Sequence, residues 1–236
     1  MSNQFATNVN QAKISIIIPT LNEAGNIDTT LKSVLGGENI EIIVVDGGSD
    51  DKTLEIVQQF PVQAMVSAPG RATQMNRGTE VAKGDIFLFL HADTQLPPGY
   101  DTMVRNALAI KGTVAGAFAL QIDAPQYSLR LIEWGVKMRS QFFQFPYGDQ
   151  AIFLTRDIFF QVGMFPTVPI MEDFILVRTL QRLGKITLIP VPVVTSARRW
   201  LSRGILKTTL INQMIIFGYF LGVSPQILHR LYQRRK

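Results

Sequence analysis

The feature that most constrains the fold is a regular alternation of strand and helix patterns between Ile14 and Leu120. Short runs of apolar, mostly β-branched residues alternate with segments whose apolar residues recur at helical spacing. The predicted strands are 14–18, 40–45, 62–66, 86–90 and 114–120, and the predicted helices are 27–35, 50–60, 72–82 and 99–110. Such alternation is typical of an α/β protein with a mostly parallel sheet covered by helices on both faces.

Acidic residues follow several of these strands. In sheets of this class, ligands bind at the carboxyl ends of the strands. Asp46 ends the second predicted strand, Asp93 lies just beyond the fourth, and Glu172 and Asp173 open a predicted helix over 172–183. Carboxylates in such places can hold a metal ion, bind a base or ribose, or accept a proton. Together they predict a ligand site at one edge of the sheet.

Each of these acids also has a purely structural explanation. Asp46 precedes Gly47 and can serve a turn, and Asp93 can cap the next element. Glu172 and Asp173 can stabilise the N-terminus of their helix through its macrodipole. The helix predicted over 50–60 has Ser49 or Asp50 as its candidate cap.

The second half of the chain is less regular. An aromatic-rich stretch runs from Trp134 to Tyr147, and the prolines within a strand predicted over 186–194 favour an edge position. Segment 208–228 has no charged residue. Near it, five apolar residues lie close to one helical face: Leu206, Leu210, Met214, Phe217 and Leu221. This face can pack on the domain or on a partner, lie in a membrane interface, or belong to a membrane span.

Composition narrows the function classes. Of the 236 residues, 47% are hydrophobic and 17% charged, so a substantial core is expected rather than wholesale disorder. The absence of cysteine excludes disulfides, thiolate metal ligands and cysteine nucleophiles, and suits a reducing compartment. Residues 1–13 are polar, and we expect a frayed tail without a secretory signal. The net charge of +5 includes basic clusters at 198–203 and 230–236, which suit a solvated surface, phosphate groups or a membrane.

Several motifs, taken in order, resemble the family 2 glycosyltransferases, which have the GT-A fold. The resemblance is specific from about Lys13 to Tyr100 and looser beyond. The early matches are 15–23 (SIIIPTLNE), 44–51 (VVDGGSDD), Gly70-Arg71, Asn76-Arg77-Gly78, Gly84-Asp85, 87–90 and 91–94 (HADT). The later matches are Gly148-Asp149-Gln150, Met171-Glu172-Asp173 and Arg198-Arg199-Trp200, and they look like a bacterial subgroup of short, stand-alone members.

The resemblance implies a domain organisation. A Rossmann-like, mostly parallel mixed sheet flanked by helices would span 13–200, with a nucleotide-binding part over 13–100 and an acceptor part over 101–200. Apart from the resemblance, the uncharged apolar segment and the basic tail lead us to expect a helical C-terminal appendage over 201–236, associated with a membrane or a partner. We expect a cytoplasmic protein, and association with the inner face of the membrane stays open. Association with a second copy stays open, and a nucleic-acid partner is not expected.

The resemblance also implies roles for individual residues. Asp46 would bind the base through a ring N–H, and Arg71 would lie near the base or the diphosphate. The complete set expected to bind the nucleotide sugar is Pro19, Thr20, Asn22, Glu23, Asp46, Gly48, Arg71, Asn76, Ala92, Asp93, Arg199 and Trp200. Gly148, Asp149 and Gln150 would belong to the acceptor region.

For the chemistry, the resemblance implies an inverting, metal-dependent transfer from a nucleoside-diphosphate sugar, with UDP the commonest choice. Asp93 would ligate Mn²⁺ or Mg²⁺, and Asp173, with Glu172 beside it, would be the general base. His91 stands where many relatives have an acid. Its imidazole can bind Mn²⁺, reach a phosphate when protonated, or serve the structure alone. The acceptor hydroxyl is unknown and can belong to a lipid or a soluble molecule.

Two other functions compete with this interpretation. A nucleotidyltransferase would also bind nucleotides on an α/β sheet, but segment 19–23 lacks the glycine-rich, basic signature expected after the first strand. A nucleotide-binding module with little turnover is the non-enzymatic alternative, which His91 favours and the Glu172-Asp173 pair opposes.

Overall fold

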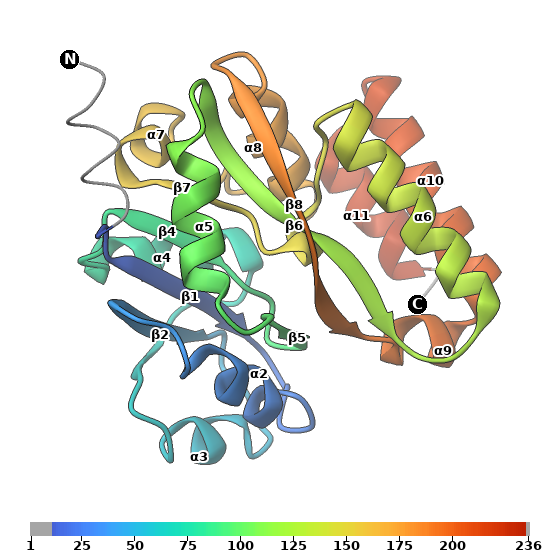
Figure 1. Cartoon of the computed structure of the whole chain (residues 1–236). Coiled ribbons are helices and arrows are strands. Elements are labelled where there is room, and N and C mark those ends of the chain that lie inside the picture. Colours follow the sequence, from blue (N-terminus) through green and yellow to red (C-terminus); the bar gives the residue numbers. More distant parts are fainter. Residues whose placement is uncertain (1–10, 235–236) are drawn as a thin grey trace.

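The computed structural model of the protein describes residues 11–234 (Figure 1). Most of the predicted N-terminal tail, and the last two basic residues of the chain, lie outside the described residues. Within the described range, the elements of the first half alternate as expected: β1 (Ile14–Thr20), α2 (Ile27–Val34), β2 (Ile40–Asp46), α3 (Thr53–Val57), β3 (Gln63–Val66), α4 (Arg71–Val81), β4 (Ile86–Phe89), β5 (Thr94–Gln95) and α5 (Tyr100–Ala109).

The second half contributes a helical layer and the remaining strands. Its elements are β6 (Thr113–Asp123), α6 (Tyr127–Phe142), the 3₁₀ helix η1 (Gly148–Gln150), β7 (Phe153–Thr155), α7 (Arg156–Gln161), α8 (Glu172–Leu180), β8 (Lys185–Ser196), α9 (Arg198–Arg203), α10 (Ile205–Phe220) and α11 (Pro225–Arg234). Sequence patterns predicted α8, and β8 approximately, but missed α6, β7 and α7.

The strands form one eight-stranded mixed sheet in the order β3-β2-β1-β4-β7-β6-β8-β5. Strands β3, β2, β1 and β4 are parallel, and β6 is parallel to β8. Strand β7 is antiparallel to both β4 and β6 and joins the two parallel parts. The predicted class, a Rossmann-like mixed α/β sheet flanked by helices with a helical C-terminal appendage, is confirmed.

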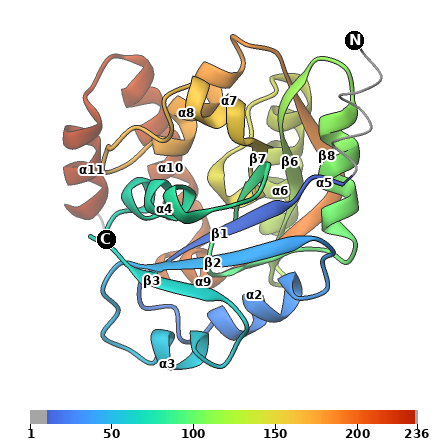
Figure 2. The same cartoon turned by 90° about the vertical axis from the view of Figure 1, so that its left-hand side faces the viewer.

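Side chains alternate across the central strands and supply two cores. Ile16 and Ile18 face one core together with α2 and α5, whereas Ile17 faces the other core together with α4 and α8. Figure 2 shows α2 and α3 on one side of β1 and β2, and α4 on the other. Because both faces are covered, the central strands β1, β2 and β4 are mostly apolar, and the parallel strands present their carboxyl ends at one edge.

The helix predicted over 50–60 is shorter than expected and its predicted cap is wrong. The Ser49 hydroxyl donates to Asp46, and the Asp50 backbone N–H donates to the side chain of Asn22, so both residues serve the loop. The Asp51 carboxylate instead accepts from the Thr53 backbone N–H at 2.9 Å, and α3 begins there.

Strand β8 is not an outermost strand, contrary to the edge prediction. It lies between β6 and β5, but β5 pairs only with Val194 and Thr195. The pairing of β8 with β6 shifts register between Ile189 and Pro192. The prolines therefore lie at this register shift, where β8 has a neighbouring strand on one side only. Since no second strand pairs there, no hydrogen bond from a proline N–H is required.

The uncharged segment 208–228 is divided between two helices. Helix α10 ends at Phe220, and Gly222 adopts a left-handed φ of 83° before α11 begins. Among the described residues, none of the helices combines the length and apolar character that a membrane crossing requires. The segment packs on the domain through Ile211 and Ile215, which are buried, whereas the predicted face with Leu206 and Phe217 is exposed, and its contact with a partner or a membrane stays a prediction.

Candidate active site

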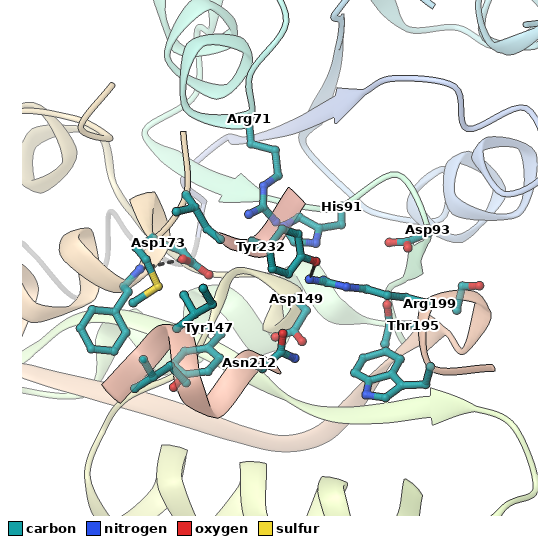
Figure 3. Close-up of a pocket in the computed structure, with 17 residues that line it drawn as sticks. Arg71, His91, Asp93, Tyr147, Asp149, Asp173, Thr195, Arg199, Asn212 and Tyr232 are labelled. Atoms are coloured by element: carbon teal, nitrogen blue, oxygen red, sulfur yellow. Dashed lines mark hydrogen bonds between the residues drawn. The ribbon is translucent and has the colours of Figure 1, made fainter. Parts of the chain in front are cut away.

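A cavity of about 180 Å³ lies where the two halves of the sheet meet the C-terminal helices (Figure 3). It is bounded by the loop after β4, the beginnings of α4 and α8, η1, the end of β8, and α9 to α11. Its polar lining is Arg71, His91, Asp93, Tyr147, Asp149, Asp173, Thr195, Ser196, Arg199, Asn212 and Tyr232. Trp200 and five apolar residues complete it: Ile170, Met171, Phe174, Ile215 and Ile216. Residues separated by more than 80 positions in sequence thus share one hollow.

Asp173 faces this cavity from the first turn of α8. Met171, the residue just before α8, has a left-handed φ of 74° that turns the chain sharply into the helix. The Oδ2 atom of Asp173 accepts a 2.7 Å hydrogen bond from the Gly148 backbone N–H, and Oδ1 accepts from the Phe174 N–H. A Cβ atom at Gly148 would lie 3.0 Å from that Oδ2 and 3.2 Å from His91 Nε2. Glycine is therefore needed for this close approach.

Glu172, which neighbours Asp173 in sequence, has a different position. Its side chain is 3% exposed and its Oε1 lies 2.7 Å from Arg71 Nε, and it does not line the cavity. Burial raises the pKa of Glu172, and Arg71 opposes that rise. The pair holds the guanidinium of Arg71 at the cavity. The structure therefore gives Glu172 the position of a residue that orients Arg71.

His91 and Asp93 follow β4 and line the same cavity. Burial lowers the pKa of His91 to about 3, and Arg71 adds to this effect, so the imidazole is neutral near pH 7. Burial raises the pKa of Asp93, as does nearby Glu23. A carboxylate and a neutral imidazole are a donor set that fits Mn²⁺. Among residues 11–234 no group of three or more such side chains lies close enough together to hold a metal ion.

Asp149 is a second acid from η1. Its Oδ1 is buried and has no hydrogen-bond partner within residues 11–234, and burial raises the pKa of its carboxyl although Arg139 opposes the rise. Arg139 stacks on Tyr147, 3.3 Å from the ring centroid. The Gln150 side chain is fully buried and bonds to Phe118 O, so it shapes η1 rather than the cavity.

The C-terminal helices close the cavity from the other side. Arg199 projects into it from α9, and its guanidinium contacts the hydroxyl of Tyr232 in α11. Trp200 lines it beside Arg199, and burial lowers the pKa of Arg199, as do the charges of Arg71 and Arg203. The neighbouring Arg198 bonds to Glu23 at 2.6 Å, which connects this segment to the end of β1.

Asp46 lies at the same edge of the sheet but does not line the cavity. It is fully buried, and its carboxylate accepts hydrogen bonds from Gly48 N, Ser49 N, Ser49 Oγ and Thr20 Oγ1. A carboxylate offers about four acceptor positions, so the turn uses them all. In this structure Asp46 serves the turn. The contact of Asp46 with a base stays a prediction. It would require a hydrogen bond from the base to replace one of these four.

The other residues expected on the donor side also lie outside the cavity lining. Pro19 pairs with Val45 within the sheet, and Asn22 holds the loop at Asp50. The Ala92 carbonyl accepts from Thr30. The side-chain amide of Asn76 makes two hydrogen bonds with the backbone of Phe165, which ties α4 to the loop after α7. These residues support the site, and their contact with a nucleotide remains a prediction.

Sequence reasoning missed several residues that build the site. Tyr147 lines the cavity, and its position directly before Gly148 in sequence could have indicated this. Buried Gln74 bonds to the carbonyls of Thr20 and Val45, and so fastens α4 to the ends of β1 and β2. Asn212 and Tyr232 reach the cavity only because α10 and α11 fold back, and no local pattern indicates that.

Known proteins resemble this chain in sequence. A family model described as glycosyl transferase family 2 matches residues 15–166, more than half of the chain. The dolichol-phosphate mannosyltransferase of Pyrococcus furiosus is 38% identical over 95 residues, which cover 36% of this chain and 27% of that protein.

Solved structures agree in fold. S. aureus TarS 1–349 in complex with UDP has a TM-score of 0.60 and 17% identity, over 78% of this chain and 60% of that one. The mannosyltransferase PcManGT from Pyrobaculum calidifontis, in complex with GDP-Man and Mn²⁺, has a TM-score of 0.61 and 22% identity, over 78% and 56%. The chain spans less than two thirds of the length of each of these three proteins. It belongs to glycosyl transferase family 2 and has the GT-A fold.

Proposed function

We propose that this glycosyltransferase transfers a sugar from a nucleoside-diphosphate sugar, with UDP as the first nucleotide to test, to an acceptor hydroxyl with inversion. The observation that supports this most strongly is the shared cavity, in which Asp173 and Asp93 face the same space as Arg71 and Arg199 (Figure 3). The complexes of similar folds with UDP, and with GDP-Man and Mn²⁺, favour this choice of donor.

Cationic groups have a clear task in this reaction. As the bond between the anomeric carbon and the phosphate oxygen breaks, negative charge grows on the leaving diphosphate. Arg71 and Arg199 line the cavity, and Glu172 keeps Arg71 in place through the 2.7 Å ion pair. When bound by Asp93 and His91, a divalent ion would supply further positive charge there. Because the Glu172 pair orients Arg71 before the reaction, its guanidinium needs little rearrangement to stabilise that charge.

Asp173 is the proposed general base. It would take the proton of the acceptor hydroxyl while the acceptor oxygen bonds to the anomeric carbon and the diphosphate leaves from the opposite face. The N–H groups of Gly148 and Phe174 orient the carboxylate. Asp149, from the predicted acceptor region, lies beside it with a buried oxygen that lacks a partner, and this oxygen can accept a hydrogen bond from the acceptor.

The Asp173→Asn variant tests this proposal. A thermal-shift screen of nucleotide sugars first selects the donor, because a bound donor raises the melting temperature. With that donor, Asp173→Asn should lower transfer by ~10²-fold or more while donor binding persists. Asp157→Asn is the matched control, since Asp157 is an exposed acid in the first turn of α7, away from the cavity. Wild-type transfer by Asp173→Asn would remove Asp173 from the mechanism.

Product analysis separates the competing functions. A glycosyltransferase releases a nucleoside diphosphate, whereas a nucleotidyltransferase releases pyrophosphate. A binding module would hold UDP tightly but show only slow donor hydrolysis under every metal condition. Either of those two results would contradict the proposed function.

A further inference from the structure

Helix α10 exposes an apolar stripe on the side that faces away from the cavity. Its inner face buries Thr208, Ile211 and Ile215. The residues of the stripe recur every three or four positions, and between 47% and 73% of each is exposed: Leu206, Leu210, Met214, Phe217 and Leu221. Single exposed apolar residues are ordinary, but a continuous row along a whole helix marks an interaction site.

Helix α6 carries a second apolar stripe. Tyr127, Leu131, Trp134 and Phe142 recur at helical spacing and are 92%, 69%, 61% and 65% exposed. The opposite side of α6 packs, through Ile132, on the same core as the start of α10. Figure 1 shows α6, α10 and α11 together at the right-hand end of the molecule. Both stripes therefore face outwards at that end.

The charge of this end points to the partner. Between Arg198 and Tyr232 there are five lysines and arginines and no acid, and of these Arg198 pairs with Glu23 and Arg199 lines the cavity, whereas the residues before Arg198 carry fewer basic than acidic groups. Lys207 and Arg230 are exposed on α10 and α11, and Lys137 is exposed on α6. A second copy of the chain would bring the same basic segment against itself in a two-fold interface, which like charges oppose. An anionic surface complements it.

We propose that the exposed stripes of α10 and α6 dock on the headgroup region of an anionic lipid bilayer. The combination of Leu, Phe and Trp on the outer face with flanking lysine and arginine is that of a helix lying in a membrane interface. This inference does not depend on the proposed chemistry. Asn212 and Ile216 of α10 line the cavity. Because a helix is about 10 Å across, docking would hold the cavity close to the lipid headgroups.

Vesicle flotation of the full chain, without donor, tests the proposal. Two vesicle compositions are compared: phosphatidylcholine alone, and phosphatidylcholine mixed with phosphatidylglycerol. We expect stronger binding to the anionic vesicles, and weaker binding as the salt concentration rises toward about 1 M, where the Debye length falls to about 3 Å. The double variant Leu210→Gln/Phe217→Gln should reduce partitioning by ~10-fold or more, and Trp134→Gln should reduce it in the same direction. Lys207→Gln should reduce only the binding to anionic vesicles, by ~5-fold.

Two control variants remove equally exposed apolar side chains elsewhere. Ile110 is 47% exposed after α5, and Val66 is 62% exposed in β3. Ile110→Gln and Val66→Gln should bind vesicles as the wild type does. Unchanged melting temperatures and UDP-induced thermal shifts would show that the stripe variants are folded. The proposal fails if the wild type floats with neither vesicle, if the controls lose binding equally, or if the wild type is a dimer that Phe217→Gln dissociates.

Discussion

The substitution Gly148→Ala perturbs the base without removing it. Gly148 lies outside the left-handed region of φ, so alanine can adopt its backbone conformation. The added Cβ would lie 3.0 Å from Asp173 Oδ2 and 3.2 Å from His91 Nε2. An ordinary contact needs about 3.5 Å, so both groups must move by a few tenths of an ångström. The 2.7 Å bond from the Gly148 N–H to Asp173 would then lengthen or bend.

The expected effect is large on turnover and small on stability. A misplacement of about 1 Å can cost 10²-fold in rate, so a shift of a few tenths should lower kcat by ~5- to 10-fold. Overpacking by one methyl group at a site that can relax costs ~1 kcal/mol, or about 2–4 °C in melting temperature for a chain of this size. Donor affinity should change less than kcat, because Asp173 acts on the acceptor and only His91, of the two displaced groups, belongs to the proposed donor side.

The assay measures nucleoside-diphosphate release at saturating donor, together with thermal unfolding. Gly135→Ala is the matched control, because Gly135 lies in α6 with open space around its Cβ position. It should raise stability by ~0.5–1 kcal/mol and leave turnover unchanged. If Gly148→Ala retains wild-type kcat, the placement of Asp173 by η1 does not govern the reaction, and the mechanism proposed above loses its geometric basis.

Two further predictions concern the remaining acids of the cavity. Burial raises the pKa of Asp149 in the folded state, so its ionisation costs stability as pH rises; Asp149→Asn should therefore stabilise the protein by ~1 kcal/mol near pH 7. This gain should shrink as pH falls toward about 4, and an equal gain at every pH in thermal unfolding would contradict it. In calorimetry, Mn²⁺ should strengthen UDP binding to the wild type, and Asp93→Ala should abolish most of that increment; equal metal dependence in both proteins would exclude Asp93 as a ligand.

Local sequence patterns were sufficient to predict most strands and helices of the first half of the protein. The β-branched runs of β1 and β2 and the helical spacing of α2 are properties of adjacent residues, so they are visible in sequence. The parallel order then places the ends of β1, β2 and β4 at one edge, where Asp93 lies, whereas Asp173 reaches the same cavity from the first turn of α8. Elements of the second half were missed where tertiary contacts decide them. One example is α6, in which only Leu129 and Ser140 are buried, so its sequence shows no row of apolar residues that face a core.

The tertiary structure alone decided what each candidate residue does. Glu172 and Asp173 are neighbours in sequence, but a helix rotates by about 100° per residue. The Glu172 carboxylate is therefore buried and pairs with Arg71, whereas Asp173 faces the cavity. Asp46 has the expected position at a strand end, but the folding of its own turn uses both of its oxygens. The sequence by itself determined the elements and the edge where acids gather, because these depend on local spacing. Which side chains reach a common cavity, and which face of α10 meets solvent, depends on contacts between distant segments that no local pattern contains.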